Sequence, residues 1–454
     1  MLLILTGILM FVIDGSVVNI ALPTITGYFE VDVAQSQWIV TSYLVVTTSL
    51  LMVFGKVSEY TGKTKMFLSG FGLFTLASLA CGLSTSLPML VFFRVLQAAG
   101  AAAAFSISAA LIFEIYPKGE QGRAMGYIGT AVSLGSIAGP MIGGYLVDFF
   151  GWEYIFLINL PIGVILLALA ARYMHLQEKR SDRLDLDWIG ATLLAIFVVS
   201  LMLFLVDLGR GLDLDMAKSA YALVTLASLA GFILQERRDR KPLLDLSVFR
   251  ERRFVLPNLC MMLFIISSFS IFILGPFYFQ GVMGYTPSQV GTVFLIVPAI
   301  MAFGAPAGGW IYDRYHYRYS SALGIMIVLI SLLLAAYATR RIDQPAMLSS
   351  FALLGLGNAL FQSPINTEIM SALPPEMLGT ASSLSSALRN LGMALGVSLS
   401  SILLTLQLGW AGYKGPILEA GPDLLSAGVS NVMVLAALLC SLGVIAAVVG
   451  NRDG

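Results

Sequence analysis

The sequence predicts an all-α polytopic membrane protein, and three observations carry that prediction. Hydrophobic residues make up 58% of the 454 positions, and only 11% of the positions are charged. The mean hydropathy is +0.87, and a water-soluble domain of this size could not cover its surface with so few charges. Apolar runs also recur along the whole chain at the length of about 20 residues that a helix needs to cross ~30 Å of hydrocarbon.

About fourteen such runs are present, which predicts about fourteen transmembrane helices. They lie near residues 1–22, 36–54, 66–84, 88–112, 122–147, 152–172, 187–206, 217–235, 254–280, 288–312, 320–338, 346–371, 377–406 and 431–450.

Lysine and arginine collect in alternate connections, and this bias predicts the orientation because cytoplasmic loops carry an excess of both residues. With a cytoplasmic N-terminus, the outer loops hold only Arg210, Lys218, Arg340, Arg341 and Lys414. We therefore expect both termini on the cytoplasmic side. The basic runs at 237–241 and 250–253 are too short to indicate nucleic-acid binding, and topology and contact with anionic lipid explain them.

Asp14 stands inside the first apolar run, and a carboxylate held in hydrocarbon marks an ion or substrate pathway by default. As a protonation site it would take up a proton when burial disfavours its charge, and release it when access changes. The alternatives are recognition of a cationic group, or a hydrogen bond between helices near Gly15 and Ser16. Glu368 is a second candidate for proton coupling, with Arg389 as its possible partner, unless it reaches water at the membrane surface.

Loops in the two halves of the chain are similar to one another, which is typical of a duplicated transporter. The first copy runs from Gly55 to Lys65, with an acid four residues after its first glycine. The same spacing recurs from Gly309 to Asp313, although His316 stands where the first copy has Gly62.

Several motifs stand in order along nearly the whole chain. They are residues 12–23 in the first run, the loop 55–65, Arg94 to Gly100, Gly135 to Gly144, and the segments 152–163 and 278–285. Together they resemble the fourteen-helix drug:proton antiporter branch of the major facilitator superfamily, with Glu59 in place of the usual aspartate of the loop signature. The resemblance covers nearly the whole chain.

The resemblance implies a major facilitator fold in three parts. We expect an N-terminal six-helix bundle at 1–175, an inserted pair of transmembrane helices with cytoplasmic linkers at 176–250, and a C-terminal six-helix bundle at 251–454. It also makes Asp14 the expected partner of Arg94, because an unpaired guanidinium in lipid is prohibitive. Since a positive neighbour favours the ionised aspartate and separation favours the protonated one, the pair would form a proton switch. The alternative is a fixed polar clamp between helices.

The fifth run carries small residues that would let a neighbouring helix approach closely. Gly139 and Gly143 share one helical face, and Pro140 can seed a kink. We expect this antiporter helix to open and seal one side of a central cavity, or to be ordinary small-residue packing. Its residues are Gly135, Gly139, Pro140, Gly143 and Gly144.

The loop signature is expected to latch the two halves in one conformation, with its acid on a basic partner or a helix N-terminus. The alternative is a role in topology alone. The residues of this conformational latch are Gly55, Glu59, Gly62 and Lys63, with Asp313 and Arg314 in the second copy.

A polar stripe in the run 346–371 is expected to line the substrate cavity. Asn358, Gln362 and Asn366 are spaced by four residues, so they share a face that should look away from lipid. Aromatic faces near a buried carboxylate suit lipophilic, often cationic, compounds. The other residues expected at the cavity are Asn19, Tyr43, Gln97, Phe277, Tyr278, Gln280 and Phe361.

These features lead to the hypothesis of a secondary active transporter. Lipophilic or cationic drugs, or related amphipathic compounds, would leave as protons enter, by alternating access. No Walker sequence is present, so we expect the proton gradient as the energy source, with no cofactor and no metal. No nucleophile or ligand constellation indicates an enzyme.

The expected partners are a small-molecule substrate, protons and the lipid bilayer, without nucleic acid, for a monomer in the inner or plasma membrane of a prokaryote. The alternatives are a narrow exporter of a metabolite or lipid, a proton symporter, or a membrane sensor that has lost transport.

Overall fold

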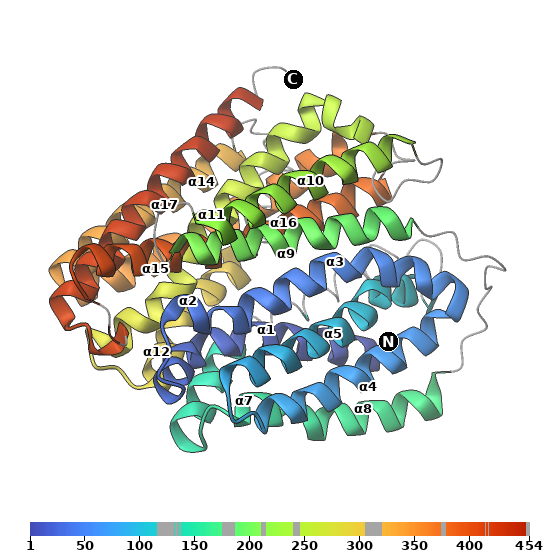
Figure 1. Ribbon diagram of the computed structural model, residues 1–454, viewed down its shortest axis with the longest axis horizontal. Helices are drawn as coiled ribbons and strands as arrows, with labels where there is room; N and C mark the ends of the chain where they lie inside the picture. Colours follow the sequence, from blue (N-terminus) through green and yellow to red (C-terminus); the bar gives the residue numbers. More distant parts are fainter. Residues whose placement is uncertain are drawn as a thin grey trace. The chain divides into compact units, whose positions relative to one another are not determined.

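The computed structural model of the protein describes residues 1–115, 138–174, 187–209, 215–238, 246–304, 320–373 and 378–450, together with residues 131 and 135 and without residues 414 and 416. Every regular element in these ranges is helical (Figure 1). In chain order the helices are α1 (Leu2–Tyr28), α2 (Val33–Ser36), α3 (Trp38–Thr61), α4 (Lys63–Gly82), α5 (Leu87–Ile115), α7 (Tyr154–Leu157), α8 (Asn159–Tyr173), α9 (Trp188–Gly209), α10 (Met216–Arg238), α11 (Arg252–Gly281), α12 (Pro287–Phe294), α14 (Ser320–Arg341), α15 (Gln344–Ser371), α16 (Leu378–Trp410) and α17 (Pro422–Gly450). Residues 138–149 and 296–304 are also helical.

Twelve helices within the described ranges are long and apolar enough to cross a membrane. The expected all-α, multi-spanning architecture is therefore confirmed. Two further predicted spans are not among the twelve. The run near 36–54 falls on α3, a continuous helix of 24 residues, and the run near 122–147 lies partly outside the described residues. Fourteen helices stay a prediction.

The described chain divides into two compact units. Unit 1 comprises Met1–Phe29, Trp38–Leu201 and Ala220–Leu243, and unit 2 comprises Glu30–Gln37, Met202–Ser219 and Leu244–Gly454. Unit 1 thus contains α1, α3, α4, α5, α7 and α8, and unit 2 contains α11, α12 and α14 to α17. The three-part division at 1–175, 176–250 and 251–454 stays a prediction.

In unit 1, α4 and α5 touch main chain to main chain. A Cβ added to Gly100 would lie 2.5 Å from the backbone nitrogen of Phe74, and one added to Gly70 would lie 2.8 Å from the backbone nitrogen of Ala104. Real side chains do not approach so closely, so only glycine fits at these two positions. Small residues allow this kind of contact between membrane helices.

In unit 2, the same kind of contact between main chains occurs between α14 and α15. A Cβ on Gly324 would lie 2.7 Å from the backbone nitrogen of Phe361, and one on Gly357 would lie 2.9 Å from the carbonyl oxygen of Gly324. The Ser331 hydroxyl also donates a 2.7 Å hydrogen bond to the carbonyl oxygen of Ser350 across the same pair of helices. The contacts of α4 with α5 and of α14 with α15 therefore both depend on glycine.

Local sequence signals explain where several helices begin. Thr286 caps α12 through a capping box with Gln289, and a proline occupies the first turn. Asp343 accepts a hydrogen bond from the backbone N–H of Ala346 at the start of α15. These side chains satisfy backbone donors that a helix start leaves open.

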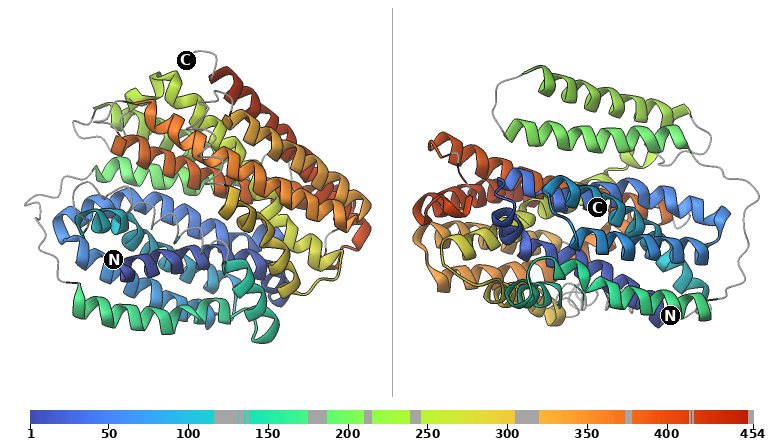
Figure 2. Two further views of the ribbon diagram at one scale, coloured as in Figure 1. Left: turned by 180° about the vertical axis from the view of Figure 1, so that it is seen from behind. Right: turned by 60° about the horizontal axis from the view of Figure 1, so that its bottom comes forward.

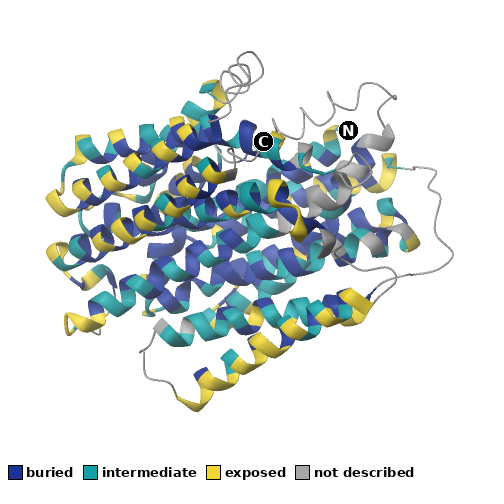
Figure 3. Cartoon of the chain, turned by 90° about the horizontal axis from the view of Figure 1, so that it is seen from above, coloured by how far each residue is buried: buried dark blue, intermediate teal, exposed yellow. Residues whose placement is uncertain are grey.

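Many large apolar side chains are exposed, and exposed residues follow one another along several of the helices (Figure 3). Leu76 of α4 is 69% exposed, Leu226 of α10 is 66% exposed and Ile165 of α8 is 60% exposed. A patch of this kind is unfavourable in water, but lipid tails are as apolar as leucine. The outer surface is therefore suited to hydrocarbon.

Helices α9 and α10 run side by side as a pair (Figure 2). The Thr225 hydroxyl donates to the Ser200 hydroxyl at 3.0 Å. At the other end of the pair, the Gln235 amide donates to Asp187 Oδ1 at 3.2 Å, and Asp187 caps the N-terminus of α9. These polar contacts join the two helices that the sequence predicts as the inserted pair.

Candidate functional site

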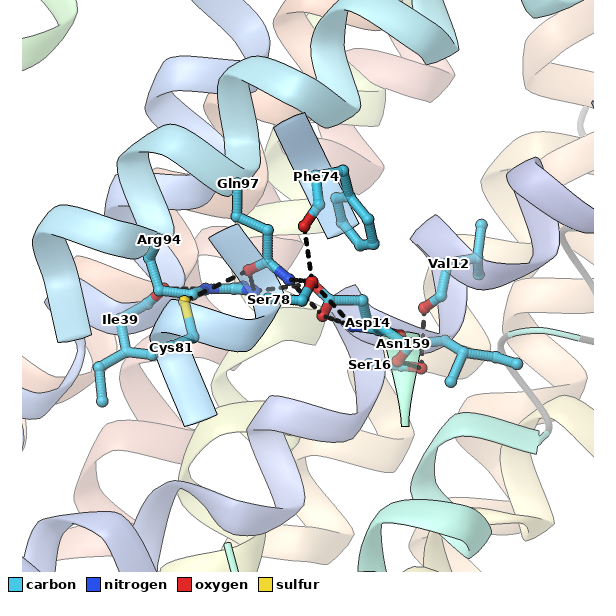
Figure 4. A network of polar contacts seen from close by, with 11 residues as sticks. Val12, Asp14, Ser16, Ile39, Phe74, Ser78, Cys81, Arg94, Gln97 and Asn159 are labelled. Atoms are coloured by element: carbon cyan, nitrogen blue, oxygen red, sulfur yellow. Dashed lines mark hydrogen bonds and ion pairs between the residues drawn. The ribbon is translucent and has the colours of Figure 1, made fainter. Parts of the chain in front are cut away.

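Asp14 lies at the centre of a closed polar network in unit 1, although it is surrounded by apolar residues of α1 (Figure 4). Its side chain is fully buried. The carboxylate accepts three hydrogen bonds: Arg94 Nη1 donates to Oδ2 at 2.7 Å, and Gln97 Nε2 and Asn159 Nδ2 donate to Oδ1 at 2.9 and 2.8 Å. In its ionised form the carboxylate therefore has one positively charged partner and two amide donors.

Arg94 of α5 is 1% exposed and forms the ion pair with Asp14 that the sequence predicts. Its Nε donates to the carbonyl oxygen of Ile39 at 3.1 Å, and Nη1 also donates to Gln97 Oε1 at 2.6 Å. The guanidinium carbon lies 4.2 Å from the centroid of the Tyr43 ring and 5.6 Å from that of Phe156. Two aromatic faces thus cover the cation, which adds cation–π stabilisation.

Helix α4 completes the network. Gln97 Nε2 and Asn159 Nδ2 both contact the Ser78 hydroxyl, at 2.7 and 3.4 Å, and that hydroxyl donates to the carbonyl oxygen of Phe74 at 2.8 Å. The Cys81 thiol lies 3.9 Å from Gln97 Oε1. Side chains of α5 and α8 contact Asp14 directly, and Ser78 of α4 is linked to it through Gln97 and Asn159. The network therefore connects Asp14 of α1 to α4, α5 and α8.

The sequence did not single out Ser78 and Asn159 for this network. Asn159 is the first residue of α8 and is 1% exposed. A signal was available, because the asparagine interrupts an apolar run directly after Phe156-Leu157-Ile158. Ser78 carried no such signal, since serine is common in packed membrane helices.

The predicted antiporter helix packs against α1 around Asp14. A Cβ on Gly139 would overlap the Ser16 hydroxyl, one on Gly143 would overlap the Val17 side chain, and one on Gly135 would lie 2.9 Å from Cβ of Val12. Pro140 and Gly144 are buried in the same helix, at residues 138–149. The glycines therefore let this helix approach the face of α1 that flanks the aspartate.

Adding a methyl group at Gly143 is expected to destabilise the protein. Val17 is stiff at χ1 and its main chain lies close behind, so Gly143→Ala should cost about 1–3 kcal/mol of the free energy of unfolding as overpacking. The thermal midpoint of the purified protein measures the effect. Gly15→Ala on α1 is the matched control, because nothing lies within 4 Å of a Cβ there. Equal midpoints for the two variants would contradict the prediction.

In unit 2, Arg389 lies in α16, near the start of the candidate span Leu388–Trp410. Its Nη2 donates to Asn366 Oδ1 at 3.0 Å and lies 3.7 Å from the sulfur of Met261, while Nη1 lies 3.5 Å from Gln362 Oε1. Gln362 and Asn366 do share a face of α15, as their spacing predicts. The Asn358 Nδ2 donates to the carbonyl oxygen of Leu354 at 2.8 Å within its own helix.

The expected partnership of Glu368 with Arg389 is wrong. The two side chains form no ion pair within the described part of the chain, and Glu368 instead accepts a 2.8 Å hydrogen bond from the Ser321 hydroxyl of α14. The reason lies in the register of α15. Residues two apart on a helix do not face the same side, so the face that brings Asn366 to Arg389 turns Glu368 toward α14.

The other residues that are predicted to line the substrate cavity differ in how far they are buried. Phe277, Tyr278 and Phe361 are fully buried inside unit 2, and the Phe361 ring stacks on Phe264 with centroids 4.2 Å apart. Each of the three would have to be uncovered before it could contact a substrate. Gln280 and Asn19 are half-buried, and Asn19 Oδ1 has no hydrogen-bond partner.

Only part of the predicted latch is described. Gly62 joins α3 to α4 with φ of 98°, a conformation that favours glycine. Gly55 and Lys63 lie on either side of it, in α3 and α4, and Glu59 occupies a helical position. Asp313 and Arg314 lie outside the described residues, so the latch stays a prediction.

No group of three or more His, Cys, Asp or Glu side chains that could hold a metal ion occurs in the described ranges.

Comparisons with known proteins agree with the fold. A family model described as the Major Facilitator Superfamily matches residues 4–397. The chain is 30% identical to riboflavin transporter RibZ of Clostridioides difficile, over 88% of this chain and 87% of that protein. It is 34% identical to multidrug resistance protein Stp of Mycobacterium tuberculosis, over 87% and 74%, and 32% identical to multidrug export protein EmrB of Escherichia coli, over 87% and 78%.

Solved structures show the same fold at low sequence identity. A bacterial homologue of the human lysosomal transporter Spinster, in an inward-facing and unoccupied conformation, aligns with a TM-score of 0.70 at 17% identity, covering 99% of this chain and 96% of that one. A D-xylose–proton symporter aligns with a TM-score of 0.65 at 15% identity, covering 97% and 96%.

The chain belongs to the Major Facilitator Superfamily. It is a multi-pass membrane transporter and not an enzyme. The multidrug relatives support the resemblance to the drug:proton antiporter branch on which the motifs agreed.

Proposed function

We propose that this chain is a proton-coupled exporter of lipophilic, amphipathic compounds, working by alternating access. The observation that carries the proposal is the fully buried Asp14–Arg94 pair, held by Gln97 and Asn159 inside a transporter of this family. A carboxylate inside a span is costly, so its presence indicates a functional site by default. Multidrug proteins are also among the relatives of the chain.

Within this proposal, Asp14 carries the proton and does not recognise a cation. Its two oxygens already accept three hydrogen bonds, one of them from a guanidinium. A substrate cation would have to displace Arg94, which Tyr43 and Phe156 cover. A proton needs only a small separation of the pair, because loss of the neighbouring positive charge favours the neutral acid.

The proposal extends to the cellular setting. The basic residues of alternate loops favour cytoplasmic termini in a bacterial plasma membrane, and the energy source is the proton gradient without any cofactor. Accessibility labelling of single cysteines placed at residues 342 and 412, in two loops expected to face outward, would test the orientation.

Transport by purified protein in proteoliposomes tests the proposed function. With an acidic lumen, protons leaving the vesicle should drive ethidium inward, and collapse of the gradient with nigericin should abolish the accumulation. Ethidium keeps its charge at all relevant pH values, so it is not trapped by acidity alone. Ethidium binding without any flux would instead support the sensor hypothesis, and no dependence on the gradient would remove proton coupling.

A second candidate is a narrow transporter of a polar aromatic metabolite. The observation that favours it is the match to the riboflavin transporter, of which the chain covers 87%, whereas it covers 74% and 78% of the two multidrug proteins. Riboflavin flux in the same vesicles, competed by ethidium or not, separates the two candidates.

A further inference from the structure

Arg389 is a cation inside a span that has no carboxylate partner among the described residues. The ion pairs in these ranges are Arg94 with Asp14 and Lys218 with Asp215. The contacts of Arg389 are the amide oxygens of Asn366 and Gln362 and the sulfur of Met261. Arg389 is the second residue of the candidate span Leu388–Trp410, and because a charged side chain within a span normally pairs with an opposite charge, this guanidinium is incompletely compensated.

The comparison with Arg94 makes the difference specific. Arg94 is 1% exposed, is paired with a carboxylate at 2.7 Å and is covered by two aromatic rings. Arg389 is half-buried and receives only neutral acceptors, one of them at 3.5 Å. Arg94 is buried and its charge is paired with a carboxylate. Arg389 is half-buried, and its charge has no carboxylate partner among the described residues.

The groups around Arg389 leave hydrogen-bond donors unused. A guanidinium has five N–H donors, and Arg389 directs only two of its nitrogens to protein acceptors. Asn366 and Gln362 present their oxygens to the arginine, so their NH2 groups remain as further donors. A cation accompanied by amide donors is suited to an oxyanion, which a guanidinium can bind through two parallel hydrogen bonds.

Apolar side chains lie beside Arg389. Met261 touches the guanidinium. Gly392, three residues further along α16, faces Met262 and Ile265 of α11 at ordinary contact distance, since a Cβ there would lie 3.4 Å from each. Met261 and Ile265 are buried and Met262 is half-buried, so a ligand that places an oxyanion on Arg389 could contact Met262 among these side chains.

We propose that Arg389, Asn366 and Gln362 bind the carboxylate or sulfonate of an amphipathic organic solute that the transporter carries. This inference rests on the proposed function and adds to its substrate class compounds that carry an anionic group. The anionic group of the substrate supplies Arg389 with a negative charge, as Asp14 does for Arg94.

Equilibrium binding of a matched probe series tests the site. The probes are 2-naphthoate, 2-naphthamide and 2-naphthylmethylammonium, which share one ring system and differ in charge. In phosphatidylcholine nanodiscs, with empty nanodiscs as the blank, the protein should bind naphthoate at least tenfold more tightly than the other two. Arg389→Gln should abolish this preference, a loss of about 1.4 kcal/mol or more at tenfold, and should leave the amide and ammonium affinities within about twofold.

Two further variants keep the test decisive if Arg389→Gln fails to fold. Asn366→Asp places a carboxylate on the guanidinium and should also weaken naphthoate binding at least tenfold, while Arg389→Lys should retain part of the preference. Arg341→Gln, at the exposed end of α14, is the matched control and should bind as the wild type does. Unchanged naphthoate binding by both Arg389→Gln and Asn366→Asp would overturn the inference.

An anionic lipid headgroup has the same chemistry as the proposed substrate group. Adding phosphatidylglycerol to the nanodiscs should leave naphthoate affinity unchanged, and competition between them would assign the site to lipid and overturn the substrate assignment. The proposed function fails separately. Gradient-driven ethidium transport without an anion preference would refute only the site, whereas Arg389-dependent binding without gradient-driven flux would refute only the coupling.

Discussion

Asp14→Asn is expected to abolish gradient-driven transport while the protein remains folded and inserted. Asparagine has nearly the shape of the aspartate, and its one side-chain oxygen can still accept either the hydrogen bond from Arg94 or those from Gln97 and Asn159, which reach different oxygens of the aspartate. It cannot take up or release a proton, so the step that couples flux to the gradient is lost. Ethidium accumulation in vesicles with an acidic lumen measures the effect, and it should fall to the level of empty liposomes.

An exposed carboxylate provides the control for this variant. Asp423→Asn, at the exposed start of α17, changes the same functional group outside the network and should transport as the wild type does. Size-exclusion profiles and thermal midpoints establish that both variants are folded. Full transport by Asp14→Asn would remove Asp14 from the mechanism.

Arg94→Ala is expected to cause the largest loss of stability. The substitution leaves the fully buried Asp14 carboxylate without its counter-ion, and breaking a buried pair in this way costs about 3–5 kcal/mol. It also empties the space between Tyr43 and Phe156, which lie over the guanidinium. The thermal midpoint in detergent should drop sharply, and transport should be lost.

The double variant Asp14→Asn with Arg94→Ala separates the charge effect from the packing effect. It should recover much of the stability that Arg94→Ala loses, because no unpaired charge remains, and it should still fail to couple transport to the gradient. Arg341→Ala, exposed at the end of α14, is the control for loss of an arginine and should stay within about 0.5 kcal/mol of the wild type. Equal stability of Arg94→Ala and the wild type would show that the pair is not structurally important.

The spans and the charged residues inside them were accessible from the sequence because both follow from the cost of transferring groups into hydrocarbon. Apolar runs predict α1, α4, α5 and α11 close to their observed ranges, and the same reasoning isolates Asp14 and Arg94. Their contact spans 80 positions along the chain. Its prediction came from the resemblance, since transfer costs alone require a partner without saying which one.

What could not be predicted depends on which helix faces meet. Asn159 reaches Asp14 across 145 positions, and no local pattern connects the two residues. The Glu368 partnership failed for a related reason, because the turn of α15 between Asn366 and Glu368 decides which neighbour each one contacts. The glycine contacts between α4 and α5 were missed because neither Gly70 nor Gly100 has another glycine four residues away.

Those glycines have a mechanical consequence. At Gly70 and Gly100, and again at Gly324 and Gly357, the main chain of one helix lies against the main chain of its neighbour, which leaves little room for either helix to slide along the other. Each pair, α4 with α5 and α14 with α15, should move as one rigid body during the transport cycle. Covalent bridges placed across either seam should therefore leave turnover intact, and the sliding surfaces of this transporter must be sought at other helix boundaries.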